Sequence, residues 1–355
     1  MRVPTFLSIL LLPLSLLYGA ILAIRNLCYK QNIFNIYKAP VPVISVGNIS
    51  MGGTGKTPMA EFLLRKMEEN GIKAAYLSRG YGRKTKGYLR VDPYSGDSDD
   101  YGDEAFQVAH KFPKIPVAVS ENREKGIREL LKENVELIIL DDAFQHRKVA
   151  RDLDLVLIDA NRLPAEDRVV PAGTLRESVG GLKRGDMLLI NKISYDSQIE
   201  NISQELSKWQ KDLAFMRVEQ MEVKAFDPTQ EFTEMNLKEE KEVILFSGIG
   251  NPDFFQAQIQ AAGWKIRKHI KFGDHYDFKG KDIGRLLKEK GERSIFLCTE
   301  KDFYRLLNKS FSEKLRGEAF YYIPIQLRIL QGEEFLLEKL EELNLKTHRD
   351  NSTQN

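Results

Sequence analysis

The chain of 355 residues carries 53 Lys and Arg, 51 Asp and Glu, and 42% hydrophobic residues, a balance typical of folded proteins and not of disordered ones. Its length is enough for about two domains. The net charge of +2 argues against a surface built to bind nucleic acid, and the two cysteines, Cys28 and Cys298, have no spacing that indicates a disulfide framework or a zinc site.

The first predicted element is an apolar helix near the N-terminus. The stretch between Arg2 and Arg25 has no charge, and as a helix it would be roughly 33 Å long, enough to cross a hydrocarbon core of about 30 Å. Pro4 and Pro13 interrupt it, and basic residues flank it without any acid. This favours association with the cytoplasmic side of a membrane, either across it or in its interface. A cleaved signal peptide and a helix buried in a soluble core are the alternatives.

Short apolar runs then alternate with amphipathic stretches, the pattern of a parallel sheet covered by helices. Strands are predicted at 41–46, 74–77, 117–119, 137–140, 155–158 and 187–190, and helices at 57–70 and 123–134. A helical stretch to about 213 and a β-rich segment at 215–225 precede a second series. It has strands at 243–246, 265–270, 294–298 and 321–329 and helices at 252–262 and 281–290. We expect the polar tail after Thr347 to be frayed.

A glycine-rich segment after the first strand indicates a phosphate site. The glycines of the run Gly52-Gly53-Thr54-Gly55-Lys56-Thr57 allow backbone N–H groups to point at phosphate oxygens, while the lysine reaches the β- and γ-phosphates and the Thr57 hydroxyl can bind Mg²⁺. Ser50 stands where the strict motif has a glycine.

We therefore expect an α/β fold of the P-loop NTPase type, with a parallel sheet and flanking helices, followed by a second, smaller α/β domain joined by a β-rich linker. The predicted divisions are a membrane-associated helix at 1–30, a P-loop domain at 31–212, and the linker with the second domain at 213–347.

Two carboxylates, Asp141 and Asp142, end an apolar strand, where P-loop proteins hold Mg²⁺ directly or through water. The segment Asn191-Lys192-Ile193-Ser194 resembles a guanine-recognition motif but has serine in place of the required aspartate, so ATP is the expected nucleotide.

Between the glycine-rich loop and the two carboxylates, five basic residues occur from 79 to 90 without an acid. Their position predicts a binding loop for an anionic acceptor, and Arg123 and Arg176 are further candidates to grip phosphate or sugar oxygens.

The motifs VGNISMGGTGKTP, SRGYGRK, GDEA, ENR, LDDAFQHR, VPAGTLRE, GDHYDF and TEKD occur in this order over residues up to about 302. In this respect the chain resembles the tetraacyldisaccharide 4′-kinase family of lipid A biosynthesis. The resemblance implies transfer of the ATP γ-phosphate to the 4′-hydroxyl of tetraacyldisaccharide 1-phosphate, giving lipid IVA at the cytoplasmic face of the bacterial inner membrane. The expected partners are the glycolipid and membrane lipids, and no protein partner is identified.

The resemblance also implies residue roles. Asp103 would be the base that accepts the hydroxyl proton, with His275 as its partner from the second domain, and Lys56 would act on the phosphates. Gly52, Gly53, Thr54, Gly55, Lys56 and Thr57 would bind ATP, and Thr57, Asp141, Asp142 and Glu177 would shape the Mg²⁺ site. Arg79, Tyr81, Arg123, Gln145 and Arg176 would contact the glycolipid.

Two other classes of protein are weighed against this interpretation. A regulatory, membrane-cycling P-loop ATPase commonly carries an additional lysine before GGTGKT, and Ser50-Met51 offers none. A nucleotide-binding adaptor without chemistry would leave the carboxylates and His275 unexplained.

Overall fold

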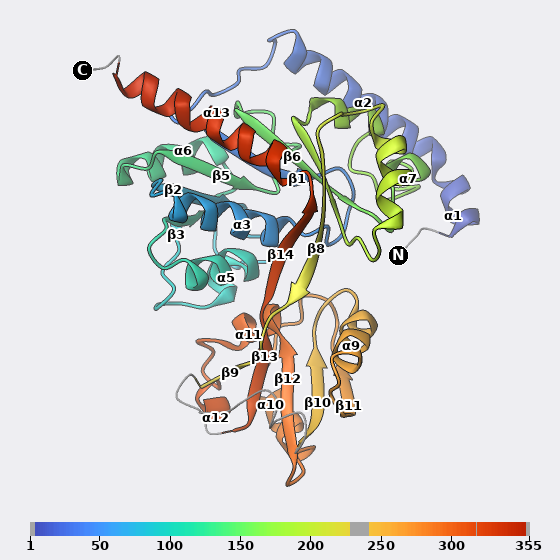
Figure 1. The fold of residues 1–355 in the computed structure, drawn as a ribbon, viewed down its shortest axis with the longest axis vertical. Helices are drawn as coiled ribbons and strands as arrows, with labels where there is room; N and C mark the ends of the chain where they lie inside the picture. The colour runs from blue at the N-terminus through green and yellow to red at the C-terminus, as the bar shows by residue number, and fades with distance from the viewer. Residues whose placement is uncertain (1–3, 228–240, 317, 353–355) are drawn as a thin grey trace.

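Two sheets organise the protein in the computed structural model, which describes residues 4–227, 241–316 and 318–352 (Figure 1). We call the part built on a nine-stranded sheet the large lobe (residues 37–220 and 325–343) and residues 221–324, built on a five-stranded sheet, the small lobe. The expected α/β fold of the P-loop type with a second α/β unit is confirmed. The division into domains at residues 30 and 212 stays a prediction.

The large sheet has the strand order β14-β8-β7-β6-β1-β5-β2-β4-β3. Its strands are β1 (Val43–Asn48), β2 (Ala74–Ser78), β3 (Leu89–Arg90), β4 (Val117–Val119), β5 (Leu137–Asp141), β6 (Leu153–Asp159), β7 (Met187–Asn191), β8 (Leu213–Gln220) and β14 (Ile325–Gln331). All neighbours pair in parallel except β3 with β4 and β14 with β8 at the two edges. The central strands are buried along their whole length, which explains why they are continuous apolar runs without alternation.

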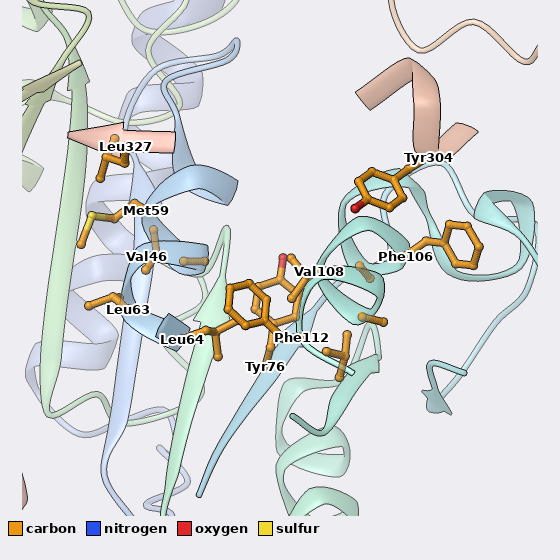
Figure 2. Packing of buried hydrophobic residues seen from close by; sticks show 14 of the residues in the cluster. Val46, Met59, Leu63, Leu64, Tyr76, Phe106, Val108, Phe112, Tyr304 and Leu327 are labelled. Atoms are coloured by element: carbon orange, nitrogen blue, oxygen red, sulfur yellow. The ribbon is translucent and has the colours of Figure 1, made fainter. Parts of the chain in front are cut away.

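Helices cover this sheet and extend its core. They are α3 (Lys56–Glu69), α4 (Ser98–Tyr101), α5 (Asp103–Lys111), α6 (Arg123–Leu130) and α7 (Ser197–Leu206). Figure 2 shows Leu64 of α3 beside Tyr76 of β2 and Phe112, with Met59 and Leu63 in the same layer of buried side chains. All five are at most 5% exposed. The helix that follows the glycine-rich loop is therefore fixed by its packing, and with it the position of the loop.

The small lobe repeats the α/β pattern. Its strands are β9 (Lys224–Ala225), β10 (Glu242–Ser247), β11 (Ile266–Lys271), β12 (Ser294–Thr299) and β13 (Phe320–Ile323), in the order β11-β10-β12-β13-β9, and its helices are α9 (Pro252–Ala261), α10 (Gly280–Lys288), α11 (Glu300–Leu306) and α12 (Glu313–Arg316). Strands β10 to β13 pair in parallel, and β9 joins antiparallel.

One predicted strand proves to be two. The segment at 321–329 is divided at Pro324 into β13 of the small sheet and β14 of the large sheet. Proline has no N–H to donate to a ladder, so it interrupts the pairing where the chain changes sheets. Strand β14 pairs antiparallel with β8, and Gln220 lies opposite Ile325. The two lobes are thus joined by two neighbouring segments of chain, as Figure 1 shows.

The C-terminal helix α13 (Glu333–Ser352) was not expected from the sequence. Leu336, Leu340 and Leu343 are buried, at the spacing of three and four residues that places side chains on one helical face. The helix packs against β8, and Lys339 pairs with Asp212 at 2.7 Å. The helical backbone continues to Ser352, and the expected fraying after residue 347 stays a prediction.

The N-terminal apolar stretch forms α1 (Thr5–Leu10) and α2 (Leu12–Lys30), with Pro13 in the first turn of α2, where a proline costs no hydrogen bond. Ser8 donates to the carbonyl of Ala172, and the amide of Ala172 donates to Ser15, so this end of the stretch docks on the large lobe. The apolar side chains of α2 remain mostly exposed, which contradicts the alternative of a helix buried in a soluble core. By length and composition α2 could cross a membrane.

Candidate active site

The glycine-rich loop connects β1 to α3 and is held by two asparagines. Thr54 is buried; its hydroxyl accepts a hydrogen bond from Asn48 Nδ2 at 2.9 Å, and its carbonyl accepts one from Asn191 Nδ2 at 2.9 Å. Gly55 has φ of +96°, and a Cβ there would lie 2.1 Å from Asn191 Nδ2. Asn191, from the segment compared with a guanine motif, thus anchors the phosphate loop, a role that the sequence did not indicate.

The loop fits a bound phosphate group. Nothing lies within 4 Å of a Cβ built on Gly52 or Gly53, so the backbone there is open to a ligand. The loop ends at the N-terminus of the 14-residue helix α3, whose unpaired N–H groups and positive dipole end attract anions. Lys56 begins this helix, and its Nζ lies 3.7 Å from Asp142 Oδ1.

Asp141 is the last residue of β5 and Asp142 follows it directly, beside the loop, as expected. Asp141 is 1% exposed and accepts hydrogen bonds from the Tyr76 hydroxyl at 2.7 Å and from the amide of Asp142 at 2.9 Å. Burial and the charge of Glu104 raise the pKa of Asp141 to about 6. Burial acts in the same direction on Asp142, but Lys56 and Arg176 outweigh it and lower the pKa of that carboxyl.

This edge of the sheet fits a Mg²⁺ ion held partly by phosphate. Two adjacent carboxylates and the Thr57 hydroxyl are oxygen ligands of the kind that Mg²⁺ prefers, and the ion usually takes only one or two carboxylates, with phosphates and water completing its shell. Because this donor set leaves much of the octahedral shell to phosphate and water, it matches a nucleotide-bound ion.

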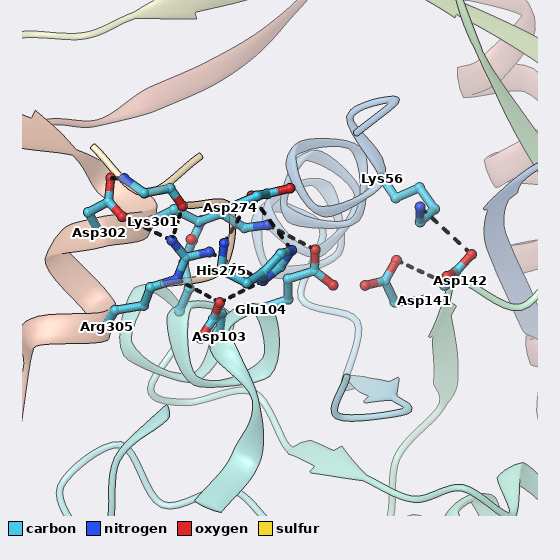
Figure 3. A network of polar contacts seen from close by, with 12 residues as sticks. Lys56, Asp103, Glu104, Asp141, Asp142, Asp274, His275, Lys301, Asp302 and Arg305 are labelled. Carbon is cyan, nitrogen blue, oxygen red and sulfur yellow. Dashed lines mark hydrogen bonds and ion pairs between the residues drawn. The ribbon is translucent and has the colours of Figure 1, made fainter. Parts of the chain in front are cut away.

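Asp103 and His275 meet across the two lobes (Figure 3). Asp103 is the first residue of α5, and His275 lies in the loop after β11 with φ of +54°. His275 Nδ1 lies 3.0 Å from Asp103 Oδ2, within hydrogen-bonding distance. The resemblance implied this pair, and the structure brings the two side chains together although 172 positions separate them.

Arg305 of α11 also contacts Asp103, and this contact was not expected from the sequence. It is 3% exposed and donates from Nε to Asp103 Oδ2 at 2.7 Å, and from Nη1 to the Gly248 carbonyl and Asp302. Burial alone would raise the pKa of Asp103, but the hydrogen bond with His275 and the Arg305 guanidinium outweigh it and lower the pKa to about 2. Asp103 is therefore a carboxylate held ionised and fixed in orientation.

Glu104 and Lys301 connect this pair to the phosphate site. Lys301 Nζ lies 3.2 Å from Glu104 Oε1. Burial acts to raise the pKa of Glu104, but the charges of Lys301 and Lys56 lower it, so its carboxylate lies within electrostatic reach of the P-loop lysine. Figure 3 shows Glu104 between Asp141 on one side and Asp103 with His275 on the other. Lys301 and Arg305 are four residues apart on α11 and share one face of the helix. This spacing, which begins within the TEKD motif, is the sequence signal that could have identified them as site residues.

A second set of ion pairs joins the two lobes, between helices α3, α5 and α11. Lys111 of α5 lies 2.6 Å from Glu61 on α3 and 2.9 Å from Glu300 on α11. All three side chains are at most 14% exposed. The helix that carries the P-loop lysine is thereby tied to the lobe that carries His275.

The five residues expected to contact the glycolipid have different environments. Tyr81 is 74% exposed, and its ring centroid lies 5.7 Å from that of His275. Arg79 is exposed. Arg176 donates to Asp142 Oδ1 at 2.7 Å. Arg123 is 2% exposed and donates to the carbonyls of Ser120 and Asp141, and burial lowers its pKa to about 10; in this conformation it supports the end of β5.

Gln145 and Glu177 interact with each other. Gln145 Nε2 donates to the carbonyl of Asn48 at 2.8 Å and to Glu177 Oε1 at 3.0 Å. Glu177, expected at the metal site, is 2% exposed and pairs with Arg184 at 2.8 Å. Its proposed part in metal binding is not tested by these contacts.

The comparisons with known proteins agree over nearly the whole chain. The family model described as "Tetraacyldisaccharide-1-P 4'-kinase" matches residues 7–344. A protein of Chlorobium limicola named tetraacyldisaccharide 4′-kinase is 37% identical over 95% of this chain and 98% of its own, and one from Flavobacterium psychrophilum is 37% identical over 93% and 94%. A crystal structure of LpxK from Aquifex aeolicus in complex with ATP has a TM-score of 0.76 and 32% identity, and the match covers 95% of this chain and 99% of that one.

Proposed function

The chain belongs to the tetraacyldisaccharide-1-P 4′-kinase family, and from this premise we propose how its residues divide the work of phosphate transfer. The activity is that of an ATP-dependent kinase, which phosphorylates the 4′ position of the lipid A precursor tetraacyldisaccharide 1-phosphate. The observation that carries the proposal is the contact of Asp103 with His275 and Arg305. This group lies beside the P-loop, because the charge of Lys56 lowers the pKa of Glu104, the residue next to Asp103. One site thus contains a proton acceptor and a phosphate cradle.

The P-loop holds the nucleotide. Backbone N–H groups of Gly52 to Gly55 bind the phosphates, and Lys56 neutralises the transferred group as its charge shifts in the transition state. The asparagine clamp on Thr54 supports this role, because a loop that is already fixed loses little entropy when ATP binds.

Asp141, Asp142 and Thr57 would hold Mg²⁺, and Glu177 would shape the site through Gln145. When bound, the ion neutralises charge on the β- and γ-phosphates. The chain's own residues set the geometry: Tyr76 orients Asp141, while Lys56 and Arg176 orient Asp142.

Asp103 receives the proton of the sugar 4′-hydroxyl. A carboxylate with a pKa of about 2 is a weak base at neutral pH. Phosphoryl transfer passes through a loose transition state in which the attacking oxygen forms little bond, so the proton can leave late and a weak, well-oriented base is sufficient. His275 and Arg305 supply that orientation. Both come from the small lobe, and the site is therefore complete only when the lobes are together.

The N-terminal helices hold the enzyme at its lipid substrate. The exposed apolar side chains of α1 and α2, with basic residues beyond them, support binding to the cytoplasmic face of the bacterial inner membrane. There the acyl chains of the acceptor can stay in the bilayer while its sugar reaches the site. A regulatory ATPase is not favoured, because a hydrolytic switch does not require a sugar-directed base that both lobes assemble.

The test is incubation of the full chain with Mg·ATP and tetraacyldisaccharide 1-phosphate in detergent, with mass spectrometry of the lipid. A product heavier by one phosphate is expected. Asp103→Asn should lower kcat by about 10²–10⁴-fold, whereas Glu124→Gln, an exposed carboxylate of α6 that pairs with Arg128, should have no effect. No transfer by the wild type would refute the activity, and full transfer by Asp103→Asn would refute the base.

A further inference from the structure

Three arginines gather where α2 meets the large lobe, outside the residues given roles above. The arginine cluster consists of Arg25, Arg147 and Arg184. Gln145 links two of them, because its carbonyl accepts a hydrogen bond from Arg25 and its side chain donates to Glu177, which pairs with Arg184. Arg147 lies two positions after Gln145, and the nearby charges of Arg184 and Arg25 add to burial in lowering its pKa. Among the ion pairs of the described residues, Glu177 is the one carboxylate that pairs with a member of the cluster. The cluster therefore keeps an excess of positive charge.

The donors of the cluster are only partly used. Arg25 donates from Nη2 to the Gln145 carbonyl at 3.5 Å, while its buried Nε has no partner. Arg184 contacts Glu177 through both Nη atoms, and its buried Nε has no partner. The hydrogen bonds of Arg147 to Asn26 both come from Nη1. Among the described contacts, the guanidinium groups of Arg25 and Arg147 bind carbonyl or amide oxygens and no carboxylate. Half-buried guanidinium groups of this kind are suited to a phosphate group, which can accept from several of them at once.

The cluster lies close to the acceptor site. Arg176 contacts Asp142 and the next residue, Glu177, contacts Arg184; consecutive Cα atoms are only about 3.8 Å apart. Gln145 joins the two places as well, because its carbonyl accepts from Arg25 and its side chain donates to Asn48 at the end of β1. A molecule that reaches from the phosphate loop along Gln145 would meet the cluster.

The cluster also lies at the basic end of the apolar helix. Arg25 follows the uncharged stretch, and Arg147 lies over the ring of Tyr29, 5.0 Å from its centroid. A lipid whose acyl chains lie along α2 would thus bring an anionic headgroup to these arginines.

We propose that Arg25, Arg147 and Arg184 form a binding site for a phosphate monoester, the 1-phosphate of the glycolipid acceptor. This rests on the proposed function. The acceptor is a disaccharide that reacts at one end and carries its phosphate at the other, so a cationic site for the 1-phosphate fixes the position of the 4′-hydroxyl beside Asp103. Binding energy from this remote group is then used to orient the reacting one.

The test compares two acceptors with the full chain in mixed micelles: tetraacyldisaccharide 1-phosphate and the same lipid without its phosphate. The variants are Arg147→Gln and Arg25→Gln, which leave no buried carboxylate unpaired, with Arg147→Lys to restore the charge. Arg128→Gln, an exposed arginine of α6, is the matched control. The KM for ATP verifies that each variant is folded.

The wild type should prefer the phosphorylated acceptor, and Arg147→Gln should lower kcat/KM for it by about ten- to a hundred-fold. With the unphosphorylated acceptor the variant should equal the wild type, and Arg147→Lys should recover part of the loss. Equal losses with both acceptors would mean that the arginines only dock α2, and would overturn the proposal. So would unchanged kinetics with both.

The phosphate of a membrane lipid headgroup could bind the arginine cluster in the same way. If the arginines bind membrane phospholipid instead, the variants should bind phosphatidylglycerol vesicles more weakly while their preference between the two acceptors stays that of the wild type, which overturns the 1-phosphate assignment. Failure of the wild type to phosphorylate either acceptor would instead contradict the proposed function, so the two failures are distinguishable.

Discussion

Replacing Asp103 by asparagine should remove a pH-dependent part of the free energy of unfolding. In the folded protein the pKa of Asp103 is about 2, below its ordinary value of 3.8, because the hydrogen bond with His275 and the charge of Arg305 outweigh the effect of burial. A carboxyl whose pKa is lowered by folding stabilises the protein fully above pH 3.8 and loses this effect as the pH falls towards 2.

The magnitude follows from the two pKa values. Their difference corresponds to about 2.4 kcal/mol at pH 5 and above, and to about 1.3 kcal/mol at pH 3. The asparagine variant lacks this contribution at every pH. The difference in free energy of unfolding between wild type and variant should therefore shrink by about 1.1 kcal/mol between pH 5 and pH 3, a range below that in which histidine side chains ordinarily titrate.

The assay is urea unfolding followed by the fluorescence of Trp264, which is buried in the small lobe. The chain has two tryptophans, so Trp209→Phe in both proteins leaves Trp264 as the reporter of the lobe that supplies His275 and Arg305. Glu124→Gln is the control, since it removes an exposed carboxylate that does not join the lobes. A difference between wild type and Asp103→Asn that stays the same at both pH values would refute the ionised contact of Asp103 with the small lobe.

Three further changes test other parts of the structure. Gly55→Ala should weaken ATP binding by about ten-fold or more, because φ of +96° strains alanine and its Cβ would clash with Asn191; an unchanged Kd in a nucleotide titration would contradict this. Leu17→Asp, on the exposed face of α2, should reduce flotation with vesicles, since a carboxylate in hydrocarbon costs about 2.5–3.5 kcal/mol; equal flotation would remove α2 from the membrane contact. Arg305→Met should destabilise the protein by about 3–5 kcal/mol, because it leaves the buried Asp302 and the carboxylate of Asp103 without their cation. Arg305→Lys should recover part of the Tm in thermal unfolding, and equal Tm values for all three proteins would argue against this role.

The phosphate loop could be predicted because its parts are contiguous. Strand, glycines, Lys56 and helix follow one another within a few residues, and each part has a local preference that does not depend on the rest of the chain. The same holds for the carboxylates at the end of β5 and for the exposed apolar helix α2. The strand predicted at 321–329 was wrong for the opposite reason: Pro324 marks an interruption locally, but only the tertiary structure shows that the chain changes from one sheet to the other there.

Local patterns thus determined the alternating α/β elements, the P-loop with its acidic partner, and the apolar N-terminal segment, because hydrophobic periodicity and glycine or carboxylate placement act over short stretches of chain. Ordered motifs implied Asp103 and His275. Only the tertiary structure decided that these two side chains meet, that Arg305 holds them, and that three arginines from distant segments gather beside α2. Such contacts depend on how two lobes and a terminal helix pack. Because the contacting residues are far apart in the chain, they produce no periodic pattern in the sequence.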